Sequence, residues 1–185
     1  ASNVTSVTNP LGKIWTNVYD NADRLTSTAA PLGNATTLTL DGVGNVLTST
    51  DALGRTTTFV YDKEDRLTSV TDALGRTQTY GYDAVGNMTS TTNPRGNTTG
   101  MSYDLNNRLT VKTDALAHAT TLAYDPSGNV TSVTYADGTI VRSEYDALNR
   151  MIKCLYPDLS EHTFSYDANG NMLSSQNASA RMEYT

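Results

Sequence analysis

The amino-acid sequence predicts an all-β fold built from tandem β-hairpins, and three observations support this prediction. A Tyr-Asp pair recurs with a period of 21 residues along the chain of 185 residues. The short segments between the turn motifs are rich in Thr, Val and aromatic residues, which favour strands. No segment shows a sustained apolar stripe at helical spacing. A repeat of this size is typical of arrays whose units pack on their neighbours. We expect one long antiparallel sheet that twists or spirals.

The repeat is marked by an aspartate that follows a tyrosine in all but one unit, where Leu40 takes the place of the tyrosine. The structural repeat positions are Tyr19, Asp20, Asp41, Tyr61, Asp62, Tyr82, Asp83, Tyr103, Asp104, Tyr124, Asp125, Tyr145, Asp146, Tyr166 and Asp167. The spacing has no insertion. We therefore interpret residues 1–185 as a single array of nearly nine repeats.

A second turn motif follows each Tyr-Asp pair about ten residues later. It is clearest as Asp-Ala-Leu-Gly-Arg at residues 51–55 and 72–76. Asp-x-x-Gly is turn chemistry, because the Asp side chain accepts backbone N–H groups two residues on and Gly tolerates positive φ. A longer period of 42 residues is superposed on the first. Arginine in the Tyr-Asp turn alternates with a Gly-Asn pair, at Arg24, Arg66, Arg108 and Arg150 against Asn45, Asn87, Asn129 and Asn171.

The side-chain pattern also predicts which residues share a face of the sheet. A three-residue loop after each Tyr-Asp pair, made by a type I turn with a Gly bulge, places the Tyr opposite the residue six positions later. That residue is apolar in every unit: Leu25, Val46, Leu67, Met88, Leu109, Val130, Met151 and Met172. Thr37, Thr58, Thr79, Thr121 and Thr163 lie on the opposite face. Because the period is odd, we expect an even loop in the second turn, centred on Leu74-Gly75.

Composition excludes several classes of function. The formal net charge is −6 and the pI is about 4.7, so the chain lacks the basic surface that nucleic-acid binding requires. No apolar run approaches the length of about 18 residues that a membrane-spanning helix needs. The N-terminus carries no recognisable signal sequence. Eleven tyrosines and abundant Thr and Val argue against disorder. Cys154 is the only cysteine, which rules out an internal disulfide.

Seven Tyr-Asp pairs in phase, joined to Asp-x-x-Gly and Arg-Leu-Thr motifs, resemble the RHS/YD-repeat family, and the resemblance covers the whole chain. It implies a hollow shell formed by a long, spiralling β-sheet, as in bacterial Rhs polymorphic toxins, toxin-complex cocoon subunits, wall-associated proteins and the more distant teneurins. It further implies that the chain is a fragment of a larger shell, outside the cell or at its surface, with the rest of the shell or an encapsulated C-terminal domain as its partner. The Asp-Pro-x-Gly-Leu self-cleavage motif of relatives is not carried over to residues 125–129, which are in register with an ordinary turn.

The titratable residues predict no catalytic, cofactor or metal site. A column of regularly spaced aspartates suggests a calcium ladder, but Ca²⁺ needs six to eight oxygen ligands and each unit offers one or two carboxylates. We interpret these aspartates as turn caps. His118 replaces a turn Arg, His162 lies in a strand, and both are interpreted as surface substitutions. Cys154 takes a position held elsewhere by Val, Ser or Thr, which predicts a packed thiol rather than a nucleophile.

Two functions remain open from the sequence. The first is a structural segment that encloses or presents another domain, either toxin cargo or an adhesive tip. The second is an adhesion module that binds glycan or protein through its Tyr and Thr faces. Its ligand-stacking residues are Trp15, Tyr61, Tyr82, Tyr103, Tyr124 and Tyr145. The competing interpretation of the tyrosines is an internal aromatic ladder. Thr-rich strands at the two ends of the sheet also predict edge-to-edge self-association.

Overall fold

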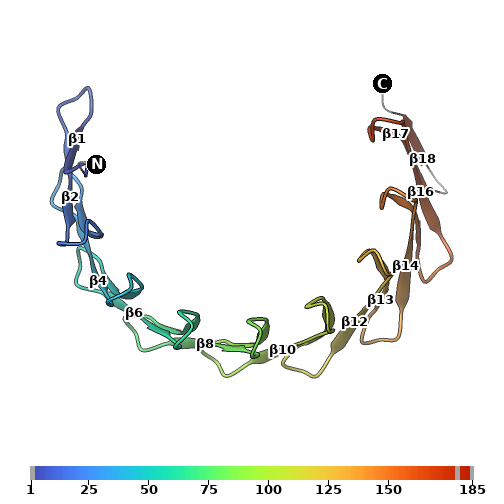
Figure 1. The fold of residues 1–185 in the computed structure, drawn as a ribbon, viewed down its shortest axis with the longest axis horizontal. Helices are drawn as coiled ribbons and strands as arrows, with labels where there is room; N and C mark the ends of the chain where they lie inside the picture. The colour runs from blue at the N-terminus through green and yellow to red at the C-terminus, as the bar shows by residue number, and fades with distance from the viewer. Residues whose placement is uncertain (1–2, 178–179, 184–185) are drawn as a thin grey trace. The chain divides into compact units, whose positions relative to one another are not determined.

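The computed structural model describes residues 3–177 and 180–183, and all regular structure in these residues is β-strand (Figure 1). The chain divides into two compact units, and each is described by itself. The first comprises residues 1–83 and 90–97, and the second comprises residues 84–89 and 98–185. The predicted all-β fold of tandem antiparallel hairpins is confirmed. No helix in the described residues is long and apolar enough to cross a membrane.

Eight strands form the first unit, and each pairs antiparallel with its neighbour in the sequence. They are β1 (Ser6–Thr8), β2 (Ile14–Tyr19), β3 (Leu25–Ala29), β4 (Ala35–Leu40), β5 (Val46–Thr50), β6 (Thr56–Tyr61), β7 (Leu67–Thr71) and β8 (Thr77–Tyr82). Strand β9 (Met88–Thr92) is divided between the two units.

The second unit repeats the same hairpins with nine further strands. They are β10 (Thr98–Tyr103), β11 (Leu109–Thr113), β12 (Ala119–Tyr124), β13 (Val130–Thr134), β14 (Ile140–Tyr145), β15 (Met151–Leu155), β16 (Glu161–Tyr166), β17 (Met172–Asn177) and β18 (Ala180–Glu183). In Figure 1 the strands of each unit follow one another in chain order.

Two sets of turns join the strands, one set at each end of the strands. We call the end with the Tyr-Asp turns the Tyr-Asp side, and the opposite end the distal side. The Tyr-Asp turns that lie within one unit occupy residues 20–24, 41–45, 62–66, 104–108, 125–129, 146–150 and 167–171. The second motif forms the distal turns, at residues 9–13, 30–34, 51–55, 72–76, 93–97, 114–118, 135–139 and 156–160.

The cross-strand register confirms the predicted pairing of each tyrosine with an apolar residue. Tyr61 lies opposite Leu67 and Tyr124 lies opposite Val130. The same relation holds in the other hairpins that lie within one unit, at Tyr19–Leu25, Leu40–Val46, Tyr103–Leu109, Tyr145–Met151 and Tyr166–Met172. Opposed residues share a face, so the tyrosines and their partners lie on one face of the sheet, here called the Tyr face.

The predicted even loop of the distal turns is wrong. Asp72 donates its N–H to the carbonyl of Arg76, and Gly75 donates to the carbonyl of Asp72, which leaves a three-residue loop like that of the Tyr-Asp turns. The odd loop is compensated by one extra residue, a β-bulge, in the strand that follows each Tyr-Asp turn that lies within one unit. Tyr61 pairs with Leu67 but Val60 pairs with Ser69, so Thr68 is an extra residue. Its hydroxyl donates to the carbonyl of Val60 at 3.1 Å. The bulge keeps successive tyrosines on the same face.

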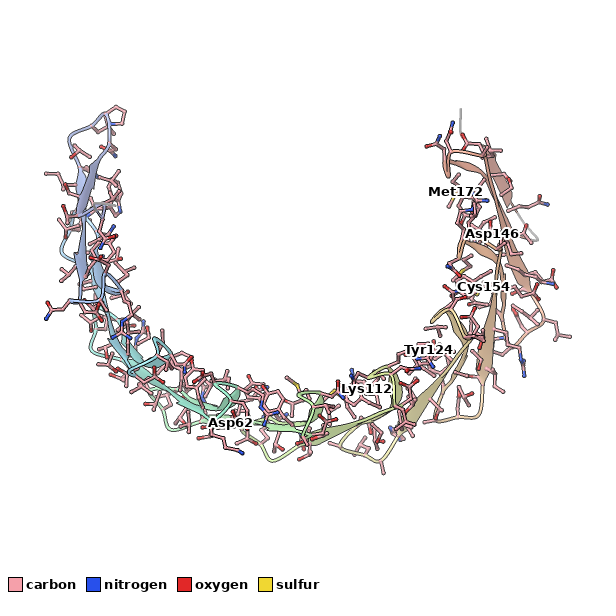
Figure 2. The ribbon with its side chains drawn as sticks, in the orientation of Figure 1. Asp62, Lys112, Tyr124, Asp146, Cys154 and Met172 are labelled. Carbon is pink, nitrogen blue, oxygen red and sulfur yellow. The ribbon has the colours of Figure 1, made fainter. Side chains whose placement is uncertain are left out.

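Each unit is a single β-layer, and its side chains are mostly half-buried or exposed. Among the described residues only Cys154 and Ser175 are buried, at 8% and 6% exposure. Figure 2 shows the side chains projecting from both sides of the strands. A layer without a closed core depends on backbone ladders and on contacts between successive turns, and those contacts define the candidate site.

Candidate functional site

Each Tyr-Asp turn is capped by its own aspartate. In the first of these turns Asp20 Oδ1 accepts the backbone N–H groups of Ala22 and Arg24, at 2.9 and 3.0 Å. Asp20 Oδ2 accepts Arg24 Nε at 2.8 Å. The side-chain bond from Arg24, followed by its backbone N–H, lowers the pKa of Asp20 against the opposing effect of burial. The same arrangement recurs at Asp62, Asp104 and Asp146, of which the first and the last are labelled in Figure 2.

The fourth residue of both kinds of turn has a left-handed backbone. Glycine fills this position in most turns, for example Gly54 and Gly75, both at φ 76°. Ala117 and Leu159 adopt it at φ 64° and 67° although their side chains disfavour that conformation. Turn geometry is therefore imposed by the hydrogen bonds even where the sequence does not supply glycine.

The arginines of alternate Tyr-Asp turns connect one turn to the next. Arg108 Nη1 donates to the carbonyl of Asp125 at 3.1 Å, and its guanidinium lies over the ring of Tyr124, 4.6 Å from the centroid. Arg66 and Arg150 make the same two contacts, with Asp83 and Tyr82 and with Asp167 and Tyr166. Arg24 donates to the carbonyl of Asp41 at 2.8 Å, where Leu40 replaces the tyrosine.

The Tyr-Asp turns that lack arginine use asparagine to contact the next Tyr-Asp turn. Asn45 Nδ2 donates to its own turn's Asp41 at 3.0 Å and to Asp65 of the following turn at 2.8 Å. Asn129 does the same with Asp125 and with Asn149, at 2.8 and 2.9 Å. The 42-residue period therefore has a physical meaning: an arginine contact and an asparagine contact alternate along the Tyr-Asp side of the sheet.

The tyrosine hydroxyls bond to the preceding hairpin. Tyr124 donates to the carbonyl of Leu109 at 2.7 Å, and Leu109 is the residue opposite the previous tyrosine. The equivalent bonds are Tyr19 to Val4, Tyr82 to Leu67, Tyr103 to Met88, Tyr145 to Val130 and Tyr166 to Met151, at 2.8–3.1 Å. These hydroxyls and arginines thus form an internal ladder along each unit, which we call the Tyr–Arg ladder.

The residues predicted to stack on a ligand all lie on the Tyr face. Trp15 pairs with Val7 and is 36% exposed. Tyr82 and Tyr124 each have an arginine over one side of the ring. Tyr61, Tyr103 and Tyr145 are half-buried. Ligand stacking by these residues stays a prediction.

The histidines differ in their surroundings. His118 Nδ1 lies 3.0 Å from Asp114 Oδ2 in an exposed distal turn, the position that Arg takes in other repeats. The interpretation of His162 as a surface substitution is wrong. It is half-buried, its Nε2 lies 2.6 Å from the Ser175 hydroxyl, and its ring stacks on Phe164 at 4.6 Å. Strand alternation places it on the Tyr face.

Cys154 is buried, in agreement with a packed thiol, and lies opposite His162. Sequence reasoning missed the placement of His162 opposite Cys154 and beside Ser175, because the pairing with Cys154 depends on the three-residue distal loop. In the described part of the chain, no three His, Cys, Asp or Glu side chains come together in a group that could hold a metal ion.

A family comparison identifies the repeat. The RHS repeat model matches residues 1–36, 41–77, 61–98, 82–119, 103–140 and 124–158, more than half of the chain. The chain belongs to the RHS repeat family. The Tyr-Asp turn and its ladder are thus the RHS repeat of this chain. No curated protein sequence matches it.

Solved structures share this RHS fold at low sequence identity. A TcdB2–TccC3–Cdc42 crystal structure is 17% identical with a TM-score of 0.74, over 93% of this chain and 12% of that chain. A TcdB2–TccC3 crystal structure is 18% identical with a TM-score of 0.72, over 89% and 11%. A Photorhabdus luminescens Tc holotoxin pore is 18% identical with a TM-score of 0.71, over 93% and 11%. The RHS segment therefore spans about an eighth or less of these chains, and the likeness concerns the fold.

Proposed function

We propose that this RHS segment is structural: a wall segment of an extracellular or cell-surface β-shell that encloses or presents another domain, and not an enzyme. The observation that carries the proposal is the Tyr–Arg ladder. Tyrosine hydroxyls and arginine side chains are bonded to neighbouring repeats, and turn carboxylates hold those arginines: Asp104 binds Arg108 within its own turn, and Arg108 reaches the carbonyl of Asp125 in the next repeat. Functional groups used in this way stiffen a sheet that has no closed core. The fold shared with the TcdB2–TccC3 structures further supports a shell.

The partners that follow from this proposal are the remainder of a parent shell and a domain held within it, either toxin cargo or an adhesive tip. Further repeats would extend the sheet through the backbone groups of its end strands, by the same antiparallel pairing as within each unit. Edge-to-edge association of those end strands stays a prediction. Neither a cofactor nor nucleic acid is part of the proposal.

The proposal is tested in the full-length protein encoded by the native gene. A cryo-electron microscopy map should show the segment continuing into a closed sheet around another domain, and that domain should resist protease until the shell is opened. A segment exposed to solvent on both faces, with every flanking domain cleaved freely, would contradict the proposal.

The alternative of an adhesion module is addressed with the chain itself. If the segment is structural, the chain should show no saturable binding when it is applied to a glycan array. Binding that is lost in a Tyr61→Ala and Tyr103→Ala variant, while the variant keeps its β-sheet circular dichroism, would instead favour ligand stacking on the Tyr face.

A further inference from the structure

The two sides of the first unit carry opposite charge. In its described residues every charged side chain lies in a turn, and strands β1–β8 carry none. The Tyr-Asp side holds seven carboxylates and three cations, a net charge of −4: Asp20, Asp23, Asp41, Asp62, Glu64, Asp65 and Asp83 with Arg24, Lys63 and Arg66. The distal side holds four cations and two carboxylates, a net charge of +2: Lys13, Arg55, Arg76 and Arg95 with Asp51 and Asp72.

The excess positive charge has an identifiable origin. In two distal turns the capping residue is asparagine, at Asn9 and Asn93, instead of aspartate. Both asparagine side chains accept the same backbone N–H groups as the aspartates do. Lys13 and Arg95 therefore add positive charge in turns that contain no carboxylate. Arg55 and Arg76, by contrast, each pair with the aspartate of their own turn.

The distal side of this unit also carries a row of exposed leucines. Leu11, Leu32, Leu53 and Leu74 occupy the middle of four successive distal turns and are 78–84% exposed. Adjacent strands lie about 4.8 Å apart, so successive leucines are separated by about 10 Å, the width of one hairpin. An exposed apolar row beside charged residues is typical of an interaction surface.

Clefts separate these distal turns. One, of about 460 Å³, is lined by residues of the turns at 51–55 and 72–76, among them Arg55, Leu74 and Arg76. The next, also of about 460 Å³, lies between the turns at 72–76 and 93–97 and includes Arg95. The Tyr-Asp turns on the other side of the sheet recur at the same hairpin spacing. The tips of one side therefore match the clefts of the other in period, while the opposite charge belongs to the two sides as a whole.

We propose that the distal side of the first unit docks against the acidic Tyr-Asp side of the same unit in a second copy of this chain. Opposite charges oriented this way favour encounter and fix the register, while the leucine row supplies apolar area to be buried. The contact is head-to-tail, since two different surfaces meet, so it generates rings or open assemblies rather than a two-fold symmetric dimer. It goes beyond the proposed function and does not rest on it.

Two variants test the contact, each with one side altered. Variant A carries Lys13→Glu and Arg95→Glu, which reverses the charge of the distal side. Variant B carries Glu64→Lys with Asp23→Asn and Asp65→Asn, which neutralises the Tyr-Asp side. Asparagine already occupies the position of Asp23 and Asp65 in other turns, at Asn107 and Asn149, so variant B should keep its fold.

Sedimentation equilibrium of the full chain gives the readout. The wild type should self-associate, more weakly in 1 M salt than in 0.1 M salt because the Debye length falls from about 10 to about 3 Å. Variants A and B should each associate at least about tenfold more weakly. An equimolar mixture should form a 1:1 complex and nothing larger, because each variant contributes the one intact side that the other lacks.

A matched control carries the same charge change as variant A at a different place. Lys112→Glu with Arg142→Glu alters strands of the second unit, and Lys112 is labelled in Figure 2. This control should associate like the wild type. Circular dichroism and thermal unfolding show whether each variant is folded, and the salt dependence of the wild type tests the contact without any variant. The proposal would be overturned by a monomeric wild type or by a mixture of variants A and B that stays monomeric. It would also be overturned if association changed neither with salt nor in variants A and B.

Discussion

The guanidinium of Arg66 lies over the ring of Tyr82, 4.9 Å from its centroid, and Arg66 Nη1 donates a 2.9 Å hydrogen bond to the carbonyl of Asp83. One side chain thus joins the turn that begins at Asp62 to the tyrosine and aspartate of the next repeat. Arg76, only ten residues away, pairs with Asp72 inside its own turn. Comparing the two arginines therefore distinguishes the effect of a contact between turns from the effect of a contact within one turn.

We expect Arg66→Ala to lower the free energy of unfolding by about 1–2 kcal/mol, since it removes a cation–π contact and a hydrogen bond to a backbone carbonyl. Arg76→Ala should cost less than about 0.5 kcal/mol, because its ion pair is exposed to solvent. Urea unfolding of both variants checks this difference. Equal losses would show that Arg66 does no more than Arg76.

Replacing Tyr124 by Phe removes the 2.7 Å hydrogen bond to the carbonyl of Leu109 and leaves the ring in place. The expected loss of stability is about 0.5–1.5 kcal/mol. Tyr135→Phe is the matched control, because the Tyr135 hydroxyl makes no hydrogen bond within the described residues and its side chain is 45% exposed. Thermal or urea unfolding measures both. A control loss as large as that of Tyr124→Phe would contradict the ladder.

Leu159→Gly should stabilise the chain by about 1 kcal/mol, because Leu159 is held at φ 67° where glycine fits without strain. Ala117→Gly, at φ 64°, should act in the same direction. The converse change, Gly138→Ala at φ 83°, should destabilise. Unfolding midpoints of the three variants provide the test, and a lower midpoint for both glycine variants would argue against the assigned turn geometry.

Acid should weaken the fold through the turn aspartates. Hydrogen bonds from Arg24, Arg55 and Arg150 lower the pKa values of Asp20, Asp51 and Asp146. A carboxyl whose pKa is lower in the folded state stabilises the fold above its unfolded pKa of about 3.9. We therefore expect a plateau of stability above about pH 5, and a decline as the pH falls through 3.9 toward the folded pKa values.

Urea midpoints measured between pH 2 and 7 test this dependence, with an Asp51→Asn and Asp72→Asn variant as the control. Asparagine keeps the backbone bonds, as Asn93 does in its own turn, but does not titrate. The control should show a shallower acid decline. Stability that rises on acidification would contradict the assignment of these carboxylates.

The faces of the sheet were predictable because strand side chains alternate with a period of two, and the apolar residue six after each tyrosine fixed the pairing. The length of the distal loop was predicted wrongly because the residue that compensates for the odd period lies in a strand and not in that loop. Thr68 is an ordinary strand residue by type, and only the hydrogen-bond register reveals it as a bulge. A bulge shifts the residue count without leaving a composition signal.

The alternation of arginine and Gly-Asn turns was visible in the sequence, but its purpose was not. Arg108 reaches Asp125 seventeen residues later, a distance that closes only after two hairpins pack side by side. The surroundings of His162 were hidden for a related reason. Its neighbour Cys154 comes from the preceding strand, in a register set by the three-residue distal loop that was predicted wrongly.

The central claim is a register that places each tyrosine opposite an apolar partner on one face, with the arginine of the preceding Tyr-Asp turn packed on the rings of Tyr82, Tyr124 and Tyr166. Nuclear Overhauser effects from the Tyr124 ring in selectively labelled protein test it most directly. The account predicts strong cross-peaks to the Val130 methyls and to the side chain of Arg108. Cross-peaks to the Thr121 methyl, with none to Val130 or Arg108, would contradict it.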